Sequence, residues 1–203
     1  IISLVTSGWF ILFARWHLLL KNSKIFIPKK DNLVIFFSSF ALAVIPGKMG
    51  DLIKSQLLKT KFGIPRSRTV PIVMLEQLYT VIGLVFLSFF GIWYFELGTY
   101  VIGFFTALLV FVFILISSRK TFNKMVLLLG KWKYTSKFVE PLSSSYDTIK
   151  TSIKGPMVFY ASALTAIFWL IEAIVVYFLL LSFGIDSIEF LKVIPTYTTS
   201  LML

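Results

Sequence analysis

The chain has 203 residues, of which 58% are hydrophobic and only 14% are charged, whereas an ordinary soluble domain is about 45–50% apolar and about 25% charged. Its mean hydropathy of +0.90 and its long apolar blocks exclude an ordinary soluble globular domain. The formal net charge of +11 would suggest a nucleic-acid partner in a soluble protein. Here most cations lie between apolar blocks, as in cytoplasmic loops of membrane proteins. We therefore predict a multi-pass, all-α protein of the cytoplasmic membrane that binds no nucleic acid.

Residue types exclude several kinds of chemistry. The sequence has no cysteine and a single histidine, His17, so it supports neither a disulfide framework nor a thiolate or histidine-rich metal site. It contains no Ser–His–Asp constellation and no Walker loop. We predict no catalytic residue, no metal and no cofactor. The chain begins with Ile1 and ends with Leu203 inside an apolar run, which predicts an internal fragment of a longer protein.

The first part of the chain predicts one span and one short re-entrant element. Residues 1–20 form an apolar block that ends at Arg15-Trp16-His17, a sequence typical of the membrane interface. After a basic connector, residues 32–45 form an apolar run that would make a helix of about 21 Å, short of the roughly 30 Å hydrocarbon core. Because both flanking segments are basic, the positive-inside rule predicts that this run enters the membrane and returns to the same side.

The middle of the chain predicts an amphipathic helix and then two spans. Residues 50–61 place apolar and polar residues on opposite helix faces: Leu52, Ile53, Leu57 and Leu58 on one side, and Asp51, Lys54, Ser55, Lys59 and Lys61 on the other. Residues 70–95 are long enough to span the membrane, and residues 99–117 return after a turn that contains no Lys or Arg. We expect that turn outside the cell.

The last part predicts a basic connector and a partial copy of the first. Residues 119–154 contain eight Lys and Arg residues and are expected to form a cytoplasmic amphipathic connector. A span over residues 157–183 and a short run over residues 193–203 follow, and Trp9 and Trp169 occupy similar places in their blocks. We predict a single transmembrane domain over residues 1–203, a helical bundle with re-entrant helices and inverted repeats. Its parts are a first repeat (1–117), the connector (118–155) and the start of a second repeat (156–203).

The most informative stretch is Pro46-Gly47-Lys48-Met49-Gly50-Asp51, where proline and two glycines interrupt an apolar helix. Non-helical backbone at membrane depth is tolerated only where protein buries it or where it lines a wet cavity. Backbone N–H groups in this stretch, with Lys48 and Lys54, are candidate ligands for a phosphate, and Asp51 would orient a lysine. The alternative is a helix that ends at the interface, with lysines that extend to the lipid headgroups.

Glu76, Glu172 and Arg15 complete the candidate binding residues. Ionisable side chains within a span cost about 2.5–3.5 kcal/mol on insertion scales, so each is expected to face a partner or a cavity. For Glu76, an ion pair with Lys48 or Arg68 is the alternative to direct contact with substrate. For Glu172, the expected partner is Arg15 or a transported cationic group, and a proton relay stays open. Arg15 would occupy the place of Glu172 in the first repeat.

The stretch from Phe40 to Leu58, followed by Gly63, Arg68 and Leu75-Glu76, resembles the transmembrane region of lysylphosphatidylglycerol synthases. This region is the flippase part of the multiple peptide resistance factor and also occurs in stand-alone relatives. The family signature runs proline, glycine, basic, any residue, glycine, acidic, then a basic residue, a leucine pair and an acidic–basic pair in the next helix. The matching positions are Pro46, Gly47, Lys48, Gly50, Asp51, Lys54, Leu57, Leu58 and Glu76. Gln77 stands where the family usually has arginine, and Thr80 where an acidic residue is common.

The resemblance implies a flippase-type translocase for an anionic or aminoacylated phospholipid, or for a polyprenyl-linked lipid. The aminoacyl-transfer domain of the full synthase is not among these 203 residues, so we expect transport rather than catalysis. Expected partners are membrane lipids, further copies of the chain or a separate synthase domain. Two other classes stay open. One is a membrane-embedded transferase that modifies lipid headgroups, with Asp51 or Glu76 as base, and the other is a non-transporting membrane scaffold.

Overall fold

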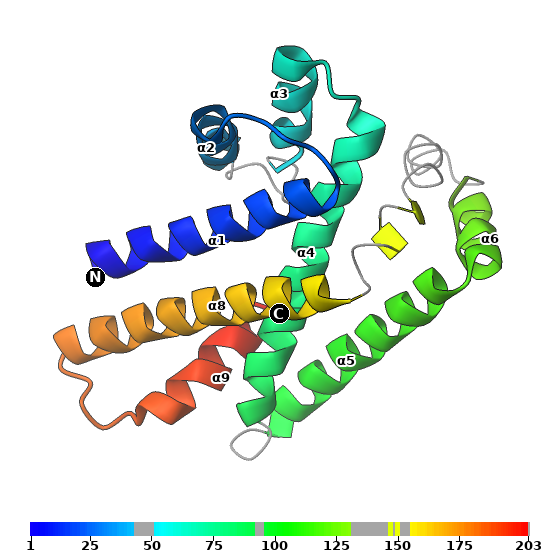
Figure 1. Cartoon of the computed structure of the whole chain (residues 1–203). Coiled ribbons are helices and arrows are strands. Elements are labelled where there is room, and N and C mark those ends of the chain that lie inside the picture. The colour runs from blue at the N-terminus through cyan, green and yellow to red at the C-terminus, as the bar shows by residue number, and fades with distance from the viewer. Residues whose placement is uncertain (43–50, 92–95, 131–145, 148, 151–154, 203) are drawn as a thin grey trace. The chain divides into compact units, whose positions relative to one another are not determined.

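The computed structural model describes residues 1–42, 51–91, 96–130, 146–147, 149–150 and 155–202 of the chain, and this described part contains helices and no strand. Figure 1 labels the α-helices. They are α1 (Ile2–Asn22), α2 (Lys29–Ser38), α3 (Leu52–Phe62), α4 (Arg66–Ser88), α5 (Glu96–Ser117), α6 (Arg119–Gly130), α8 (Pro156–Ser182) and α9 (Phe190–Ser200). Short 3-10 helices follow α2 at Ser39–Leu42 and α4 at Phe89–Gly91. The prediction of an all-α membrane protein is confirmed.

Three of the described helices are long and apolar enough to cross a membrane, namely α1, α4 and α8. Helix α5, which covers the predicted span over residues 99–117, meets the same test only when it is counted together with α6. In the most apolar part of α4, 61% of residues are buried, compared with 22% in α1 and 17% in α8. Helix α4 is therefore covered largely by protein, whereas most of the apolar stretch in each of α1 and α8 is not buried.

Helices α1 and α8 end in the same way. Each is closed by a residue in the left-handed region, Lys24 with φ 54° and Gly184 with φ 77°. In both, the next residue closes the last turn through its N–H group, from Ile25 to the Leu20 carbonyl at 2.9 Å and from Ile185 to the Leu180 carbonyl at 3.1 Å. This is the bond pattern of a Schellman cap, which stops a helix and turns the chain away from its axis.

The positions of the two caps can be compared with the predicted repeats. Lys24 and Gly184 are separated by the same number of positions as Trp9 and Trp169, and a short helix, α2 or α9, follows each cap. This correspondence supports the idea of two related segments, while the repeat boundaries and their inverted topology stay predictions. At that spacing Glu172 aligns with Leu12. The matched caps therefore give no support to the predicted equivalence of Arg15 and Glu172.

Helix α3 confirms the predicted helix over residues 50–61, but its buried face differs from the prediction. The buried side chains are Lys54, Ser55 and Leu58, so two residues assigned to the solvent face lie inside. The reason is that both bind α4: Lys54 pairs with Glu76, and the Ser55 and Thr69 hydroxyls share a hydrogen bond of 2.5 Å. The predicted re-entrant run begins with α2, and its predicted tip, Pro46 to Gly50, lies outside the described residues.

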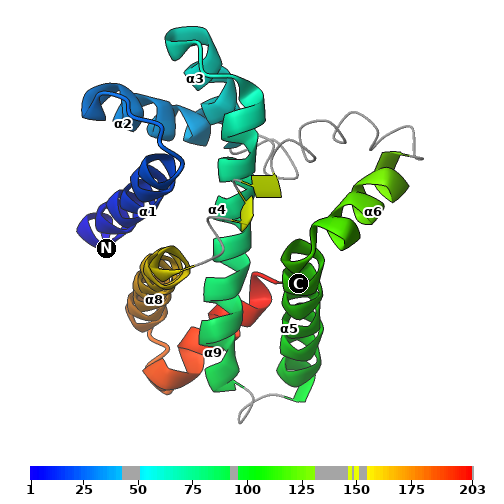
Figure 2. The ribbon, with the colours of Figure 1, turned by 45° about the vertical axis from the view of Figure 1, so that its right-hand side comes forward.

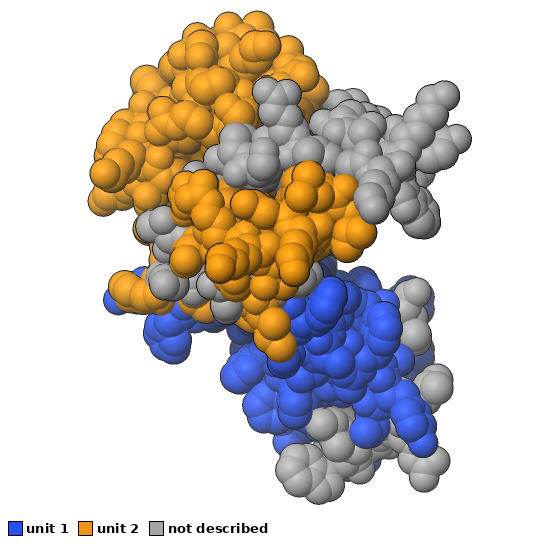
Figure 3. Space-filling model, turned by 90° about the vertical axis from the view of Figure 1, so that its right-hand side faces the viewer, with its two compact units in different colours: residues 1–15, 78–111, 159–203 blue, residues 16–77, 112–158 orange. Residues whose placement is uncertain are grey.

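The chain forms two compact units, which Figure 3 shows in different colours. One unit contains residues 1–15, 78–111 and 159–203, and the other contains residues 16–77 and 112–158. In the first unit, α8 runs alongside α1, and α9 lies beside the end of α4 (Figures 1 and 2). In the second, α2 and α3 lie together near the beginning of α4 (Figure 2). Each unit contains its own cluster of buried polar side chains.

Candidate functional site

The first polar cluster surrounds the ammonium group of Lys54 on α3. Lys54 Nζ lies 2.5 Å from Glu76 Oε2 and 3.1 Å from Asp51 Oδ1, and the side chains of Lys54 and Glu76 are only 3% and 2% exposed. The same ammonium lies 4.8 Å from the Trp16 ring centroid and 5.4 Å from that of Phe36. Two carboxylates and two aromatic faces thus stabilise a cation that burial alone would make costly.

Asp51 is the open end of this Lys54 cluster. Its side chain is 29% exposed, and its second oxygen, Oδ2, accepts a hydrogen bond of 2.7 Å from Gln77 Nε2. Gln77, which stands where the resemblance noted above leads one to expect arginine, thus contacts Asp51. Among the described residues the cluster combines two carboxylates with one ammonium. Of the other predicted phosphate ligands, Pro46, Gly47, Lys48 and Gly50 lie outside the described residues.

Helices α1 and α2 close the cluster through residues that the sequence analysis did not identify. Trp16 and Asn32 are fully buried, and Trp16 Nε1 donates a hydrogen bond of 2.8 Å to Asn32 Oδ1. Asn32 Nδ2 also lies 3.0 Å from His17 Nδ1. Trp16 is thus buried in protein, where its ring forms one wall of the Lys54 cluster, and the interfacial position of Arg15-Trp16-His17 stays a prediction. The only signal in the sequence was the polar Asn32 at the start of an apolar run.

The second cluster is centred on Arg15 of α1. Its guanidinium is buried, with the residue 5% exposed, and Nη1 donates to Thr165 Oγ1 at 2.8 Å and to Thr80 Oγ1 at 3.2 Å. Thr165 Oγ1 donates in turn to the Ala161 carbonyl at 2.8 Å. One arginine thus joins α1, α4 and α8 through hydroxyl groups. Sequence reasoning identified Arg15 but not its two threonine partners, since threonine is unremarkable in an apolar helix.

Glu172, the other predicted carboxylate, is half-buried on α8 and lies near Gly8 of α1, which has no side chain. A Cβ added to Gly8 would lie 3.9 Å from Glu172 Oε1. One turn earlier on α8, the ring of Trp169 lies 6.3 Å from that of Tyr197 on α9. Within the described part of the chain, no basic side chain forms an ion pair with Glu172. The predicted partnership with Arg15 is thus not formed.

The remaining sequence predictions concern Glu76 and metal ions. Glu76 pairs with Lys54, while Arg68, one of its predicted alternative partners, donates from Nη2 to the Ser23 carbonyl at 3.4 Å. Among the described residues, no three His, Cys, Asp or Glu side chains come together in a way that could hold a metal ion.

An apolar groove lies beside the contact between α4 and α8. Its volume is about 380 Å³, within the usual range of small-ligand sites. Phe86 and Phe159 line it, and the small residues Gly83, Ala163 and Ala166 form part of its wall. The groove therefore offers hydrocarbon-like surface within the part of the chain expected to cross the membrane.

Comparison with known proteins places these features in a family. The transmembrane region of lysylphosphatidylglycerol synthases matches residues 1–203, which is the whole chain. No curated protein and no solved structure matches it. Apolar helices and this match together establish a membrane protein with a lipid-related family assignment. The chain belongs to the lysylphosphatidylglycerol synthase transmembrane-region family.

Proposed function

We propose that this protein is a flippase-type lipid translocase of the cytoplasmic membrane, crossing it several times. Its substrate would be an anionic or aminoacylated phospholipid, or a polyprenyl-linked lipid. The observation that carries the proposal is the buried Lys54 ammonium between Glu76 and Asp51. Ionisable groups at membrane depth are costly and commonly mark the path of a substrate, and the chain belongs to a lipid-related family.

In this proposal the lipid phosphate enters the cluster from the side of Asp51. Asp51 is the more exposed and more distant of the two carboxylates, at 3.1 Å from Lys54 compared with 2.5 Å for Glu76. A phosphate would therefore replace Asp51 at the ammonium, while Glu76 keeps Lys54 in place and Gln77 retains its hydrogen bond to Asp51. Lys48 and the backbone from Pro46 to Gly50 would supply further donors.

The unit of residues 1–15, 78–111 and 159–203 has features of its own that suit a lipid. Thr80 and Thr165 hold the Arg15 guanidinium in one position, which suits it to an anionic headgroup. Glu172 would receive a cationic group, such as the amine of an aminoacylated headgroup. The groove beside α4 and α8 would accommodate part of an acyl chain, since its walls are apolar.

The test is lipid movement in liposomes that contain the full-length protein. Fluorescent phosphatidylglycerol in the inner leaflet is protected from an added reductant until it crosses, so the rate of signal loss reports translocation. We expect Lys48→Ala and Glu172→Gln to slow this rate at least tenfold without loss of membrane expression. Lys59→Ala is the matched control, because Lys59 is an exposed cation on α3. Normal rates in both site variants would refute the site assignment, and wild-type rates equal to those of empty liposomes would refute translocation.

A further inference from the structure

Helix α6 uses one of its faces to pack within its own unit. Phe122 and Val126 are 2% and 3% exposed and form a small core with Tyr146, with Met125 at its edge. The rings of Phe122 and Tyr146 lie 4.9 Å apart between centroids. This contact buries one apolar face of α6. It leaves other apolar residues of the helix, Leu127 and Leu128, exposed.

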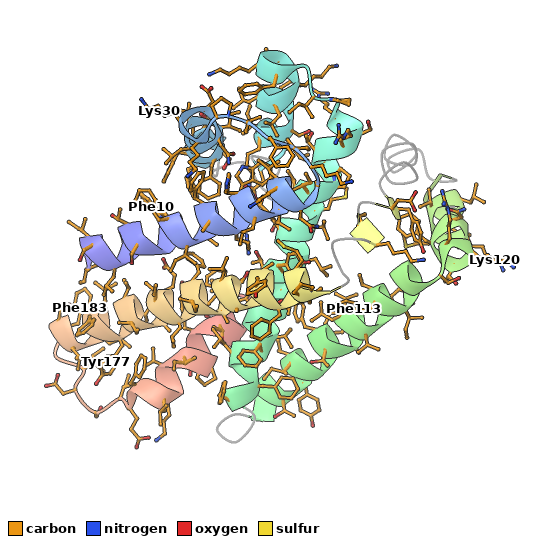
Figure 4. The ribbon with its side chains drawn as sticks, in the orientation of Figure 1. Phe10, Lys30, Phe113, Lys120, Tyr177 and Phe183 are labelled. Carbon is orange, nitrogen blue, oxygen red and sulfur yellow. The ribbon has the colours of Figure 1, made fainter. Side chains whose placement is uncertain are left out.

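The opposite face of α6 combines cations with exposed leucines. Residues four and seven or eight positions apart lie on one helix face, which places Lys120, Lys124, Leu127 and Leu128 together. Leu127 is 68% exposed and Leu128 is 59% exposed, and Lys120 points outward from the helix (Figure 4). Two adjacent leucines exposed beside two lysines are typical of helices that lie at a membrane surface.

The surroundings of Tyr146 add to the positive charge of this region. Arg119 and Lys150 lie 5.5 Å and 5.3 Å from the Tyr146 ring centroid, and the Arg119 side chain is 63% exposed. Asp147 is the one acidic residue in the described part of residues 118–150, and it lies 3.6 Å from Arg119. Counting Lys120 and Lys124, four cations therefore outnumber a single carboxylate in this described region.

We propose that this α6 face binds a surface of anionic phospholipids. Lys120 and Lys124 would contact headgroup phosphates, while Leu127 and Leu128 enter the acyl boundary. Charge complementarity selects anionic lipid, and the exposed leucines favour a lipid surface over a polyanion such as nucleic acid, which offers no hydrocarbon layer. The contact is separate from the proposed translocation site, because none of its residues belongs to the Lys54 or Arg15 clusters. Its effect would be to make the position of α6 depend on the anionic lipid content of the membrane.

The test places a probe at the tip of this face. The chain has no cysteine, so Leu128→Cys allows an environment-sensitive fluorophore to be attached at one position, with Leu127 retained. The protein is placed in nanodiscs of phosphatidylcholine alone or mixed with phosphatidylglycerol, each with a nitroxide quencher in the acyl region. We expect phosphatidylglycerol to increase quenching at least threefold and to shift the emission to the blue, and we expect high salt to reverse most of both effects.

Charge variants separate the proposed contact from a general response. K120Q/K124Q should lose at least half of the increase, while K29Q/K30Q, which removes two exposed cations from α2, should keep it. Leu127→Ser should reduce quenching without altering the Phe122–Tyr146 core. Equal quenching in both membranes, no quenching in either, or a full response in K120Q/K124Q would each overturn the proposal. Because no transport is measured, these outcomes are independent of whether the protein translocates lipid.

Discussion

Gly83 of α4 and Thr165 of α8 lie so close together that a Cβ added to Gly83 would be 2.6 Å from Thr165 Cγ2 and 3.0 Å from its Cβ. Real Cβ atoms do not approach other atoms so closely, so Gly83→Ala must displace either the Thr165 side chain or the two helices. We expect this substitution to destabilise the protein by about 1–3 kcal/mol, the usual cost of overpacking. Thermal unfolding of the purified protein in detergent, followed by tryptophan fluorescence, would measure the loss.

Gly103→Ala is the matched control for this prediction. Gly103 also lies within an apolar helix, α5, but a Cβ there would meet nothing within 4 Å. We expect it to be neutral or slightly stabilising, because alanine favours helix more than glycine by about 1 kcal/mol. Adding Thr165→Ser to Gly83→Ala should restore part of the stability, since serine lacks the clashing methyl group. Equal losses for Gly83→Ala and Gly103→Ala would contradict the close packing.

The Lys54–Glu76 ion pair should behave as a buried pair. Lys54→Met removes the ammonium that lies 2.5 Å from Glu76, and Glu76→Leu removes the nearer of the two carboxylates beside Lys54. We expect either change to destabilise the protein, by up to about 3–5 kcal/mol. The double variant Lys54→Met/Glu76→Leu removes both charges. Its free energy of unfolding should fall by less than that of the more destabilised single variant. A double-mutant cycle of unfolding free energies measures this coupling. Additive losses would show that the two side chains do not interact.

The hydroxyl group of Thr165 should contribute more to the stability of the protein than its methyl group does. Thr165→Val removes the acceptor that lies 2.8 Å from the buried guanidinium of Arg15, and we expect a loss of about 1–3 kcal/mol. Thr165→Ser keeps the hydroxyl and should retain most of the stability. Thr6→Val, at an exposed position of α1, should change it by no more than about 0.5 kcal/mol. A stable Thr165→Val variant would mean that Arg15 does not depend on this bond.

The two glutamates within the spans should respond differently to neutralisation. Glu76→Gln weakens a contact of 2.5 Å to the Lys54 ammonium and should lower the unfolding temperature clearly. Glu172→Gln breaks no ion pair among the described residues and should leave stability nearly unchanged while slowing lipid movement. Unfolding and translocation are therefore measured on the same preparations. Strong destabilisation by Glu172→Gln, with transport reduced only in proportion to folded protein, would indicate a structural role.

The predicted topology can be tested in the chain as it stands, because it has no cysteine. Single cysteines are introduced and labelled in intact cells with a reagent that does not cross membranes. The positive-inside rule predicts that cysteines at Lys30, Lys61 and Lys137 are protected from the reagent. It predicts that cysteines at Gly98 and Ser187 are labelled. Labelling that places Lys30 and Lys61 on opposite sides would show that residues 32–45 cross the membrane, and the inverted-repeat prediction would fail with it.

Several features follow from the sequence because they depend on local composition. A helix can cross a bilayer because it satisfies its own backbone groups, and a crossing helix needs a long apolar block. The extents of α1 and α8 were therefore predictable within two residues, whereas α4 begins four residues and ends seven residues before the predicted span. The sequence also identified Lys54, Glu76 and Arg15 as candidates, because an ionisable residue within or beside an apolar block is costly unless it has a partner or a role.

The partners of those residues were decided only by tertiary structure. Helical periodicity assigned Lys54 to the polar face of its helix, yet Lys54 is buried, because Glu76 lies 22 positions further along the chain and compensates its charge. In the same way, Thr165 becomes the partner of Arg15 across 150 positions. Hydrophobic pattern measures the average preference of a residue for apolar surroundings. Whether a buried charge is tolerated depends instead on particular side chains around it, several of them distant in the sequence, which periodicity cannot identify.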